Sequence, residues 1–298
     1  MPPQFSNVKG GSQQLRTGYD VPLIGYGTYK VVGKDVLPAI DAALSAGYRL
    51  FDTAKYYKNE AELGAALKEL LPKHGLKREE VFLTTKFFAI AAEDAFEEAT
   101  RLVDESLESL GVEYLDMVLV HYPKADASSN DDPKNAHHRK STYLALEKIK
   151  ESGKIRSVGV SNYEISHLQE IESYGKELPC ANQLEYHPHF VREPLHLYCK
   201  KHGIFFQAFS SLARQEPALI DDPVLVNIAK KHNQPVTLIL LAWALNQGVG
   251  IIPKSATPSR IVDNIKVAEV KLSAEEIQEL TSLDRGQHYI RCTGWLVK

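Results

Sequence analysis

Apolar, strand-like runs alternate with amphipathic, helix-like runs eight times along this chain, and this alternation restricts the fold more than any other feature. Consecutive β/α units pair their strands in parallel, because each helix carries the chain back across the sheet. Eight such units in 298 residues indicate an α/β protein with a closed (β/α)8 barrel, also called a TIM barrel. A doubly wound open sheet remains the alternative.

The expected elements follow from the spacing of the apolar residues. The strands are expected at residues 23–27, 48–52, 81–86, 117–121, 157–161, 181–185, 204–209 and 249–253. The helices that follow them are expected at 35–46, 60–70, 94–110, 140–152, 166–174, 194–202, 237–246 and 259–266. A β-hairpin with its turn near Thr17 and Gly18 precedes the barrel. Two extra helices are expected at 223–232 and 274–283, the second opened by a capping box of Ser273 and Glu276.

The chain carries no segment that reads as a linker between domains. We therefore expect residues 1–298 to form one barrel domain. The long polar stretch at 123–140 lies within a β/α connection and is expected to be a loop over the site.

Composition narrows the classes of partner. A net charge of -3 with 44% hydrophobic residues lacks the basic excess of a nucleic-acid-binding protein, so we expect a small-molecule partner. The three cysteines, Cys180, Cys199 and Cys292, form no CxxC or Cys/His cluster, so we expect neither bound metal nor a disulfide framework. The first ten residues lack the apolar region of a signal peptide, and no uninterrupted apolar run approaches the 18 residues of a membrane-spanning helix. We expect a cytoplasmic monomer without a membrane span.

Three of the apolar runs end on an ionisable residue, namely Asp52, Lys86 and His121, which lie 34 and 35 residues apart. In a β/α barrel the carboxyl ends of the strands meet at one rim, where active sites are built. An aspartate, a lysine and a histidine are therefore expected to converge there.

Tyr57 follows Asp52 by five residues and can bend back toward the same rim. A phenol with an ordinary pKa of ~10 is a poor proton donor near neutrality, but a neighbouring ammonium such as Lys86 lowers that pKa. Asp52 would hold Lys86 charged, and His121 would orient a substrate oxygen. Taken singly, each residue also fits a structural role in packing, helix capping or buried hydrogen bonding.

Over nearly its whole length the sequence resembles the aldo-keto reductase family. The resemblance rests on Gly47-Tyr48-Arg49, then Asp52-Thr53-Ala54, then Tyr57-Lys58-Asn59-Glu60. It implies a catalytic tetrad of Asp52, Tyr57, Lys86 and His121, with Tyr57 as the general acid. It also implies a nicotinamide dinucleotide that delivers hydride to a carbonyl carbon.

A second block, residues 252–264, follows the eighth strand and carries a lysine, an arginine and hydroxyl groups. Late βα loops of barrels often bind phosphate, and this chemistry suits an anion. By resemblance Lys254, Ser255, Arg260 and Asn264 grip the 2′-phosphate and adenine, which favours NADP(H) over NAD(H). Asp263 stands where the family commonly has glutamate, so an adenine contact there is open.

The remaining site residues are also carried by the resemblance. Ser161, Asn162 and Gln183 would hold the nicotinamide amide, although from the residues alone they fit a helix cap and a satisfied strand end equally well. Further cofactor contacts are expected from Gly27, Thr28, Asp52, Phe209 and Ser210. Substrate contacts are expected from Tyr29, Tyr57, Phe88, His121, Tyr122 and Trp295.

The expected function is therefore an NADPH-dependent reduction of aldehydes or ketones. Two rivals stay open. Relatives that reduce a steroid C=C bond carry glutamate at the histidine position, and His121 argues against that chemistry. A barrel that only binds or senses NADPH, with little or no catalysis, would keep the same tetrad. The chain has no GxGxxG fingerprint after a strand and no Walker A, HExxH or GxSxG motif. These absences argue against a classical Rossmann enzyme, a nucleotide hydrolase and a serine hydrolase.

Overall fold

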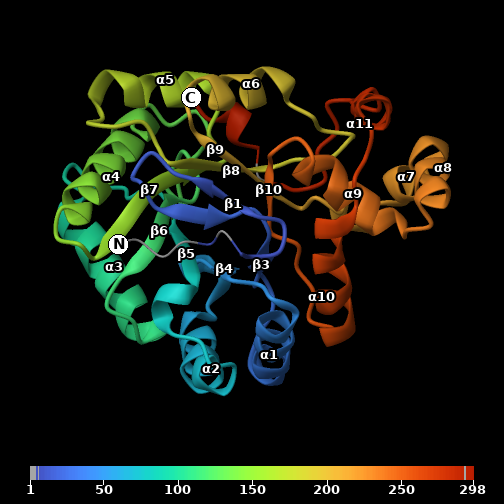
Figure 1. Cartoon of the computed structure of the whole chain (residues 1–298). Coiled ribbons are helices and arrows are strands. Elements are labelled where there is room, and N and C mark those ends of the chain that lie inside the picture. Colours follow the sequence, from blue (N-terminus) through green and yellow to red (C-terminus); the bar gives the residue numbers. More distant parts are fainter. Residues whose placement is uncertain (1–4, 6, 292) are drawn as a thin grey trace.

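The computed structural model describes residues 5, 7–291 and 293–298, and its centre is an eight-stranded parallel sheet. The strands run in chain order around the sheet (Figure 1): β3 Gly25–Gly27, β4 Leu50–Asp52, β5 Phe82–Phe87, β6 Leu115–Val120, β7 Ile155–Ser161, β8 Ala181–Glu185, β9 Phe205–Phe209 and β10 Gly250–Ile251. A parallel bridge between Ile24 and Ile251 joins the two edges. The backbone of Ile251 donates to the Leu23 carbonyl at 2.8 Å. The expected (β/α)8 barrel is confirmed.

One helix follows each barrel strand and packs on its outer surface (Figure 1): α1 Val36–Ala46, α2 Glu60–Lys73, α3 Phe96–Leu110, α4 Asn135–Lys150, α5 Ile165–Tyr174, α6 Glu193–Lys201, α9 Val236–Leu245 and α10 Pro258–Asn264. Outside this ring lie α7 Pro217–Ile220, α8 Pro223–His232 and α11 Ala274–Thr281. Short 3-10 turns complete the chain: η1 Gly33–Asp35, η2 Lys55–Tyr57, η3 Arg78–Glu80, η4 Ala213–Gln215, η5 Ile265–Glu269 and η6 Gly294–Leu296.

Both expected extra helices, α8 and α11, are present. The capping box at the start of α11 is formed, because Ser273 accepts from the Glu276 backbone and the Glu276 carboxylate accepts from the Ser273 backbone.

The expected loop at 123–140 is wrong in its second half, because α4 begins at Asn135 and not at residue 140. The inner face of the first turns of α4 is polar, with buried Asn135, His138 and Arg139. Arg139 donates to the Glu170 carboxylate on α5 at 2.7 and 2.6 Å. An apolar periodicity cannot reveal a helix whose buried side is polar.

The strands point alternate side chains into the barrel and out toward the helices. Leu50, Phe82, Met117, Leu119 and Phe205 belong to one apolar cluster inside the barrel. Their strand neighbours belong to the larger cluster between barrel and helices: Phe51, Leu83, Val118 and Phe206. Apolar side chains therefore fill the barrel interior among the described residues of this cluster.

A hairpin of β1 Ser12–Gln14 and β2 Asp20–Pro22 covers the end of the barrel where the strands begin (Figure 1). Its Leu15 side chain belongs to the inner cluster. The Thr17 hydroxyl at its tip lies 2.8 Å from the Ser157 hydroxyl at the start of β7, and Arg16 donates to the His202 carbonyl at 2.6 Å. The hairpin closes this end, so the opposite rim is the end open to ligands.

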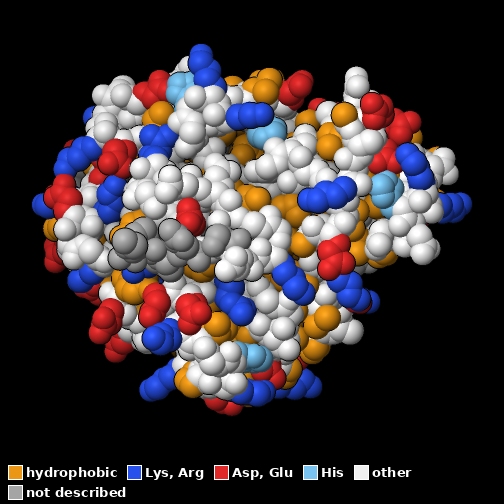
Figure 2. All heavy atoms as spheres, viewed as in Figure 1, with side chains coloured by type: hydrophobic (Ala, Val, Ile, Leu, Met, Phe, Trp, Pro, Cys, Tyr) orange, Lys and Arg blue, Asp and Glu red, His pale blue; other side chains and the backbone are white. Residues whose placement is uncertain are grey.

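The surface charges, the helix lengths and the cysteines bear on which partners the chain could bind. Acidic and basic side chains are interspersed over the face shown in Figure 2. In the described part of the chain, no helix combines the length and the apolar character needed to span a membrane. Within that same part no group of three or more His, Cys, Asp and Glu side chains is arranged to hold a metal ion. Cys180 and Cys199 are buried free thiols, and Cys292 lies outside the described residues.

The close packing of α2 on α3 gives a stability prediction at Gly64. A Cβ atom there would lie 2.6 Å from the Leu110 Cα and carbonyl oxygen, and neither backbone atom can swing away. We expect Gly64→Ala to lower the free energy of unfolding by about 1–3 kcal/mol, although alanine is the better helix former.

Urea unfolding followed by circular dichroism measures this change. Lys68→Ala, an exposed position on the same helix, is the matched control and should shift the free energy by less than about 0.5 kcal/mol. Equal stability of Gly64→Ala and the unaltered protein would contradict the packing argument.

Candidate active site at the carboxyl rim

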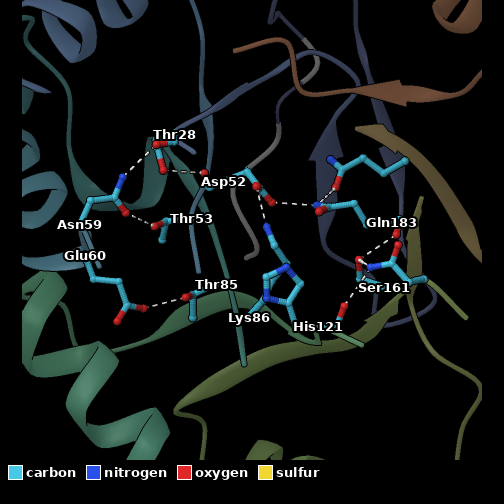
Figure 3. Close-up of polar contacts among 12 residues, drawn as sticks. Thr28, Asp52, Thr53, Asn59, Glu60, Thr85, Lys86, His121, Ser161 and Gln183 are labelled. Carbon is cyan, nitrogen blue, oxygen red and sulfur yellow. Dashed lines mark hydrogen bonds and ion pairs between the residues drawn. The ribbon is translucent and has the colours of Figure 1, made fainter. Parts of the chain in front are cut away.

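A buried ion pair lies at the centre of the open rim (Figure 3). The Lys86 Nζ atom on β5 donates to Asp52 Oδ1 at the end of β4 at 2.6 Å, and both side chains are at most 1% exposed. Asp52 Oδ2 accepts from Gln183 Nε2 at 2.7 Å, and the same amide group donates to Gln207 Oε1 at 2.8 Å. Both carboxylate oxygens are thus engaged.

Burial and charge act in opposite directions on Lys86. Burial lowers the pKa of the Lys86 ammonium, because a charged group loses solvation, while the Asp52 carboxylate raises it. A buried ammonium without a counter-ion would lose its proton or destabilise the fold. The positive charge at Lys86 therefore depends on Asp52.

Tyr57 and His121 complete the group of four that the sequence predicted to converge. The Lys86 Nζ atom lies 5.1 Å from the centroid of the Tyr57 ring. The Tyr57 and His121 rings lie 5.9 Å apart, and Tyr29 lies 5.0 Å from Tyr57 on another side. The structure brings all four residues to one place on the rim.

The loop that carries Tyr57 is tied to the loop after β3. Buried Asn59 accepts from the Thr53 hydroxyl at 2.8 Å and donates to the carbonyls of Thr28 and Val31, both at 2.9 Å. Thr28 in turn donates its hydroxyl to the Asp52 carbonyl at 2.9 Å (Figure 3). These bonds hold both ends of the loop that contains η2, and they fix where the Tyr57 ring can lie.

His121 is held as a neutral imidazole. Its ring stacks on Phe88 with centroids 5.1 Å apart, and its Nδ1 atom is buried without a hydrogen-bond partner in the described structure. Burial, and next the positive charge of Lys86, lower the pKa of His121 to about 3. A neutral imidazole keeps one N–H donor for a ligand in this pocket.

Ser161, Asn162 and Gln183 form a hydrogen-bonded group where β7 ends beside the middle of β8. The Ser161 hydroxyl donates to the Gln183 carbonyl at 2.8 Å. The Asn162 amide nitrogen donates to the His121 carbonyl at 3.0 Å and to Ser161 Oγ at 3.1 Å. Asn162 has a left-handed backbone with φ of 63°. The Asn162 side chain is therefore held by two partners in a constrained turn.

The other expected cofactor residues lie along the rim from β9 to β3. Phe209 ends β9 and is half-buried, and Ser210 follows it with φ of 54°. At Gly27 a Cβ would lie 2.8 Å from the Ile252 carbonyl oxygen and 3.6 Å from Lys254 Cβ, so only glycine lets β3 and this loop approach so closely.

The segment 252–264 after the eighth barrel strand is called the late basic loop, and its lysine and arginine side chains are exposed to solvent. Lys254 and Arg260 are exposed, whereas Asn264 is buried. Burial of part of the side chain, and next the charge of Lys30, lower the pKa of Lys254. The Ser255 carbonyl accepts from the Tyr26 hydroxyl at 2.6 Å, which fastens the loop to β3.

The aromatic residues expected to contact substrate are only partly gathered. Tyr29 lies against Tyr57, and Phe88 lies against His121. Tyr122 is buried, with Lys124 Nζ 5.8 Å from its ring. Trp295 packs against Phe190, with centroids 5.2 Å apart, and against His288 at 4.9 Å.

Sequence reasoning missed Gln207, which supports the Gln183 side chain from β9. The signal was present, because Gln207 is the one polar residue within the apolar strand Phe205–Phe209 and falls on the inward side of that strand. A polar residue inside a barrel needs a buried partner, and Gln183 provides it.

Comparisons with known proteins match most of the chain to a single protein family. A model of the Aldo/keto reductase family matches residues 23–285. The chain is 36% identical over 275 residues to the glyoxal reductase of Bacillus subtilis (strain 168), covering 92% of this chain and 93% of that protein. It is 36% identical over 294 residues to human (Homo sapiens) aldo-keto reductase family 1 member A1, covering 93% and 90%. The solved structure of MGS-M4, an aldo-keto reductase enzyme from a Medee basin deep-sea metagenome library, superimposes with a TM-score of 0.82 at 35% identity, covering 93% and 96%.

The low pKa of His121 gives a prediction about acid. The folded-state pKa of about 3 lies below the unfolded value of ~6.5, so the neutral imidazole stabilises the fold fully above pH ~6.5. That stability is lost as the pH falls from there toward 3. We expect the His121 imidazole not to titrate between about pH 5 and 8, and the loss between pH 7 and 5 to reach up to about 2 kcal/mol.

Histidine-selective NMR gives the titration, with His121→Asn used to assign the signal. Unfolding in urea at pH 7 and pH 5 gives the stability change, which should be smaller in His121→Asn. A titration midpoint above pH 5 would show that burial and the charge of Lys86 do not hold His121 neutral.

Proposed function

Given that the chain belongs to the aldo/keto reductase family and is thereby an oxidoreductase, we propose that it reduces the carbonyl group of aldehydes or ketones with NADPH. The observation that supports this most directly is the buried Lys86–Asp52 ion pair beside the Tyr57 ring, with neutral His121 on the other side. Reduction of a carbonyl needs a proton donor at the oxygen, and this arrangement can supply one.

In this proposal Tyr57 is the general acid. The Lys86 ammonium lies 5.1 Å from the Tyr57 ring centroid and favours the phenolate over the phenol, which makes the hydroxyl a better proton donor. Asp52 keeps Lys86 charged, as its 2.6 Å contact allows. His121 donates one hydrogen bond to the substrate oxygen and turns it toward the Tyr57 hydroxyl.

The residues present fit a nicotinamide cofactor. A bound reduced nicotinamide would supply the hydride. Asn162 and Gln183 use their amide nitrogens within the protein, which leaves amide oxygens suited to accept from a carboxamide. Ser161 holds this pair together, and Gly27 and Thr28 line the neighbouring rim. The half-buried face of Phe209 suits stacking on a flat ring, and Ser210 adds a hydroxyl beside it.

The preference for NADPH over NADH rests on the late basic loop. Lys254 and Arg260 are exposed cations, and Ser255 and Asn264 add polar groups on the same segment. A 2′-phosphate is a dianion that such a set can bind, whereas the 2′-hydroxyl of NADH offers it little.

The substrate side is aromatic. Tyr29, Phe88 and the Tyr57 ring surround the place where a carbonyl would lie, and Tyr122 and Trp295 are proposed as outer contacts. Such walls bind flat apolar groups and compact dicarbonyls better than polyhydroxy chains. The Bacillus subtilis relative is named as a glyoxal reductase, which is in keeping with a compact substrate.

The second candidate function is a barrel that only senses NADPH, which would bind the cofactor without turnover. We further propose a single domain and a monomer in the cytoplasm.

Replacement of the acid tests the reaction. Tyr57→Phe keeps the ring and removes the hydroxyl, so we expect kcat for 4-nitrobenzaldehyde to fall by ~100-fold or more while the Kd for NADPH stays within about twofold. Steady-state absorbance of NADPH at saturating cofactor gives kcat, and a fluorescence titration with NADPH gives the Kd.

Tyr198→Phe, on the outer helix α6, is the matched control and should keep full activity. Unchanged turnover in Tyr57→Phe would mean that another group protonates the substrate. Absence of turnover in the unaltered protein, together with tight NADPH binding, would favour the sensing barrel.

The phosphate site is tested by removing its two cations together. Lys254→Ala with Arg260→Ala should weaken NADPH by tens-fold or more and NADH by far less, because charge-assisted hydrogen bonds contribute about 1.5–3 kcal/mol each. Cofactor fluorescence titrations give both Kd values. Lys266→Ala, whose ammonium pairs with Asp263 at 2.7 Å, controls for the loss of a nearby charge. Equal weakening of both cofactors would mean that this loop does not read the phosphate.

A further inference from the structure

The segment after α11 is held against the open rim by buried polar groups. It runs past the ends of β8 and β7 and reaches the side of the barrel near α5 and α6 (Figure 1). The Glu185 carboxylate, 1% exposed at the end of β8, accepts from the backbone of Tyr289 at 2.7 Å and of Ile290 at 3.2 Å. This contact fixes the segment on one side of the mouth.

Two helices hold the same segment on the other side. His167 on α5 accepts from the Glu164 backbone through Nδ1, so its Nε2 carries the proton that it donates to the Val297 carbonyl at 3.0 Å. Arg139 on α4 donates to the Lys298 carbonyl at 3.1 Å. The described residues 291 and 293–296 therefore lie between two fixed points.

The turn η6, Gly294–Leu296, lies within this bridge and rests on Asn162. A Cβ atom on Gly294 would lie 2.0 Å from the Asn162 carbonyl oxygen and 3.2 Å from Asn162 Cβ. Glycine is required here by the close approach, since any side chain would overlap the backbone of Asn162.

Asn162 cannot easily move aside. Its backbone N–H donates to the Gln183 carbonyl at 3.0 Å, and its side chain donates to the His121 carbonyl and to Ser161. The turn therefore presses on Asn162, which is hydrogen-bonded to the His121 carbonyl and to the Ser161–Gln183 pair. A shift in the turn and a shift in Asn162 are coupled.

We propose that Gly294 is a positioning residue for the nicotinamide site: because it has no side chain, the turn Gly294–Leu296 closes onto Asn162 and holds the Asn162 amide in place. The inference rests on the proposed function, in which Asn162 binds the nicotinamide carboxamide. By reciprocity, cofactor at Asn162 favours the closed turn as much as the closed turn favours the cofactor. The effect should be confined to ligands that reach Asn162.

Gly294→Ala tests this with two ligands. We expect the Kd of NADP+ to rise about tenfold, because the added methyl displaces either the turn or Asn162. The Kd of adenosine 2′,5′-bisphosphate, which has no nicotinamide, should stay within about twofold. Isothermal titration calorimetry gives both values. Thr293→Ala changes the neighbouring residue without the overlap and should leave both affinities unchanged.

A second measurement uses the unaltered protein, so it does not depend on how the variant folds. The amides of Leu296 and Val297 donate to the carbonyls of Thr293 and Gly294 within the turn. Saturating NADP+ should slow hydrogen exchange at these two amides by about tenfold, and adenosine 2′,5′-bisphosphate should not.

The outcomes separate the two proposals. If the unaltered protein binds adenosine 2′,5′-bisphosphate and NADP+ equally and reduces no aldehyde, the proposed function fails, and this inference fails with it. If it reduces aldehydes, but Gly294→Ala binds NADP+ as tightly as before or loses both ligands equally, only the role of Gly294 is overturned. Unchanged exchange at Leu296 and Val297 with NADP+ overturns that role as well.

Discussion

The alternation of side chains along the parallel strands of a closed barrel is the constraint on which the rest of this structure depends. Every second residue points inward, so the two-residue steps from Leu50 to Asp52 and from Leu119 to His121 carry each strand from the apolar interior to the polar rim. The same rule brings Gln183 and Gln207 inward beside each other. A shift of one residue in any strand would exchange these side chains with those of the outer core.

The buried ion pair at the rim follows from that geometry and carries a stability penalty. Two charges removed from water are stabilised only when each is paired and hydrogen-bonded. Lys86 meets this condition through Asp52, and Asp52 through Lys86 and Gln183. The surrounding apolar clusters supply the stability that lets the barrel retain a charged, water-poor pocket. Such a pocket strengthens the influence of Lys86 on the neighbouring Tyr57 ring.

The rim is also completed by parts of the chain that are distant in sequence. Asn59 ties the Tyr57 loop to the carbonyls of Thr28 and Val31. The turn Gly294–Leu296 lies on Asn162, more than 130 residues before it. Each of these contacts joins two loops and not two strands. The barrel core therefore determines where the loops start, and contacts between loops, polar at Asn59 and steric at Gly294, determine their final shape.

The sequence by itself determined the number and order of the β/α units, the extra helices α8 and α11, and the convergence of Asp52, Lys86 and His121, because apolar periodicity and strand ends are local properties. It misplaced the start of α4, since Asn135, His138 and Arg139 make a buried face that is polar. It also missed Gln207 and Gly294. Only the tertiary structure decided these points, because the partner that each residue needs lies far away in the chain, and sequence spacing carries no information about which distant surfaces meet.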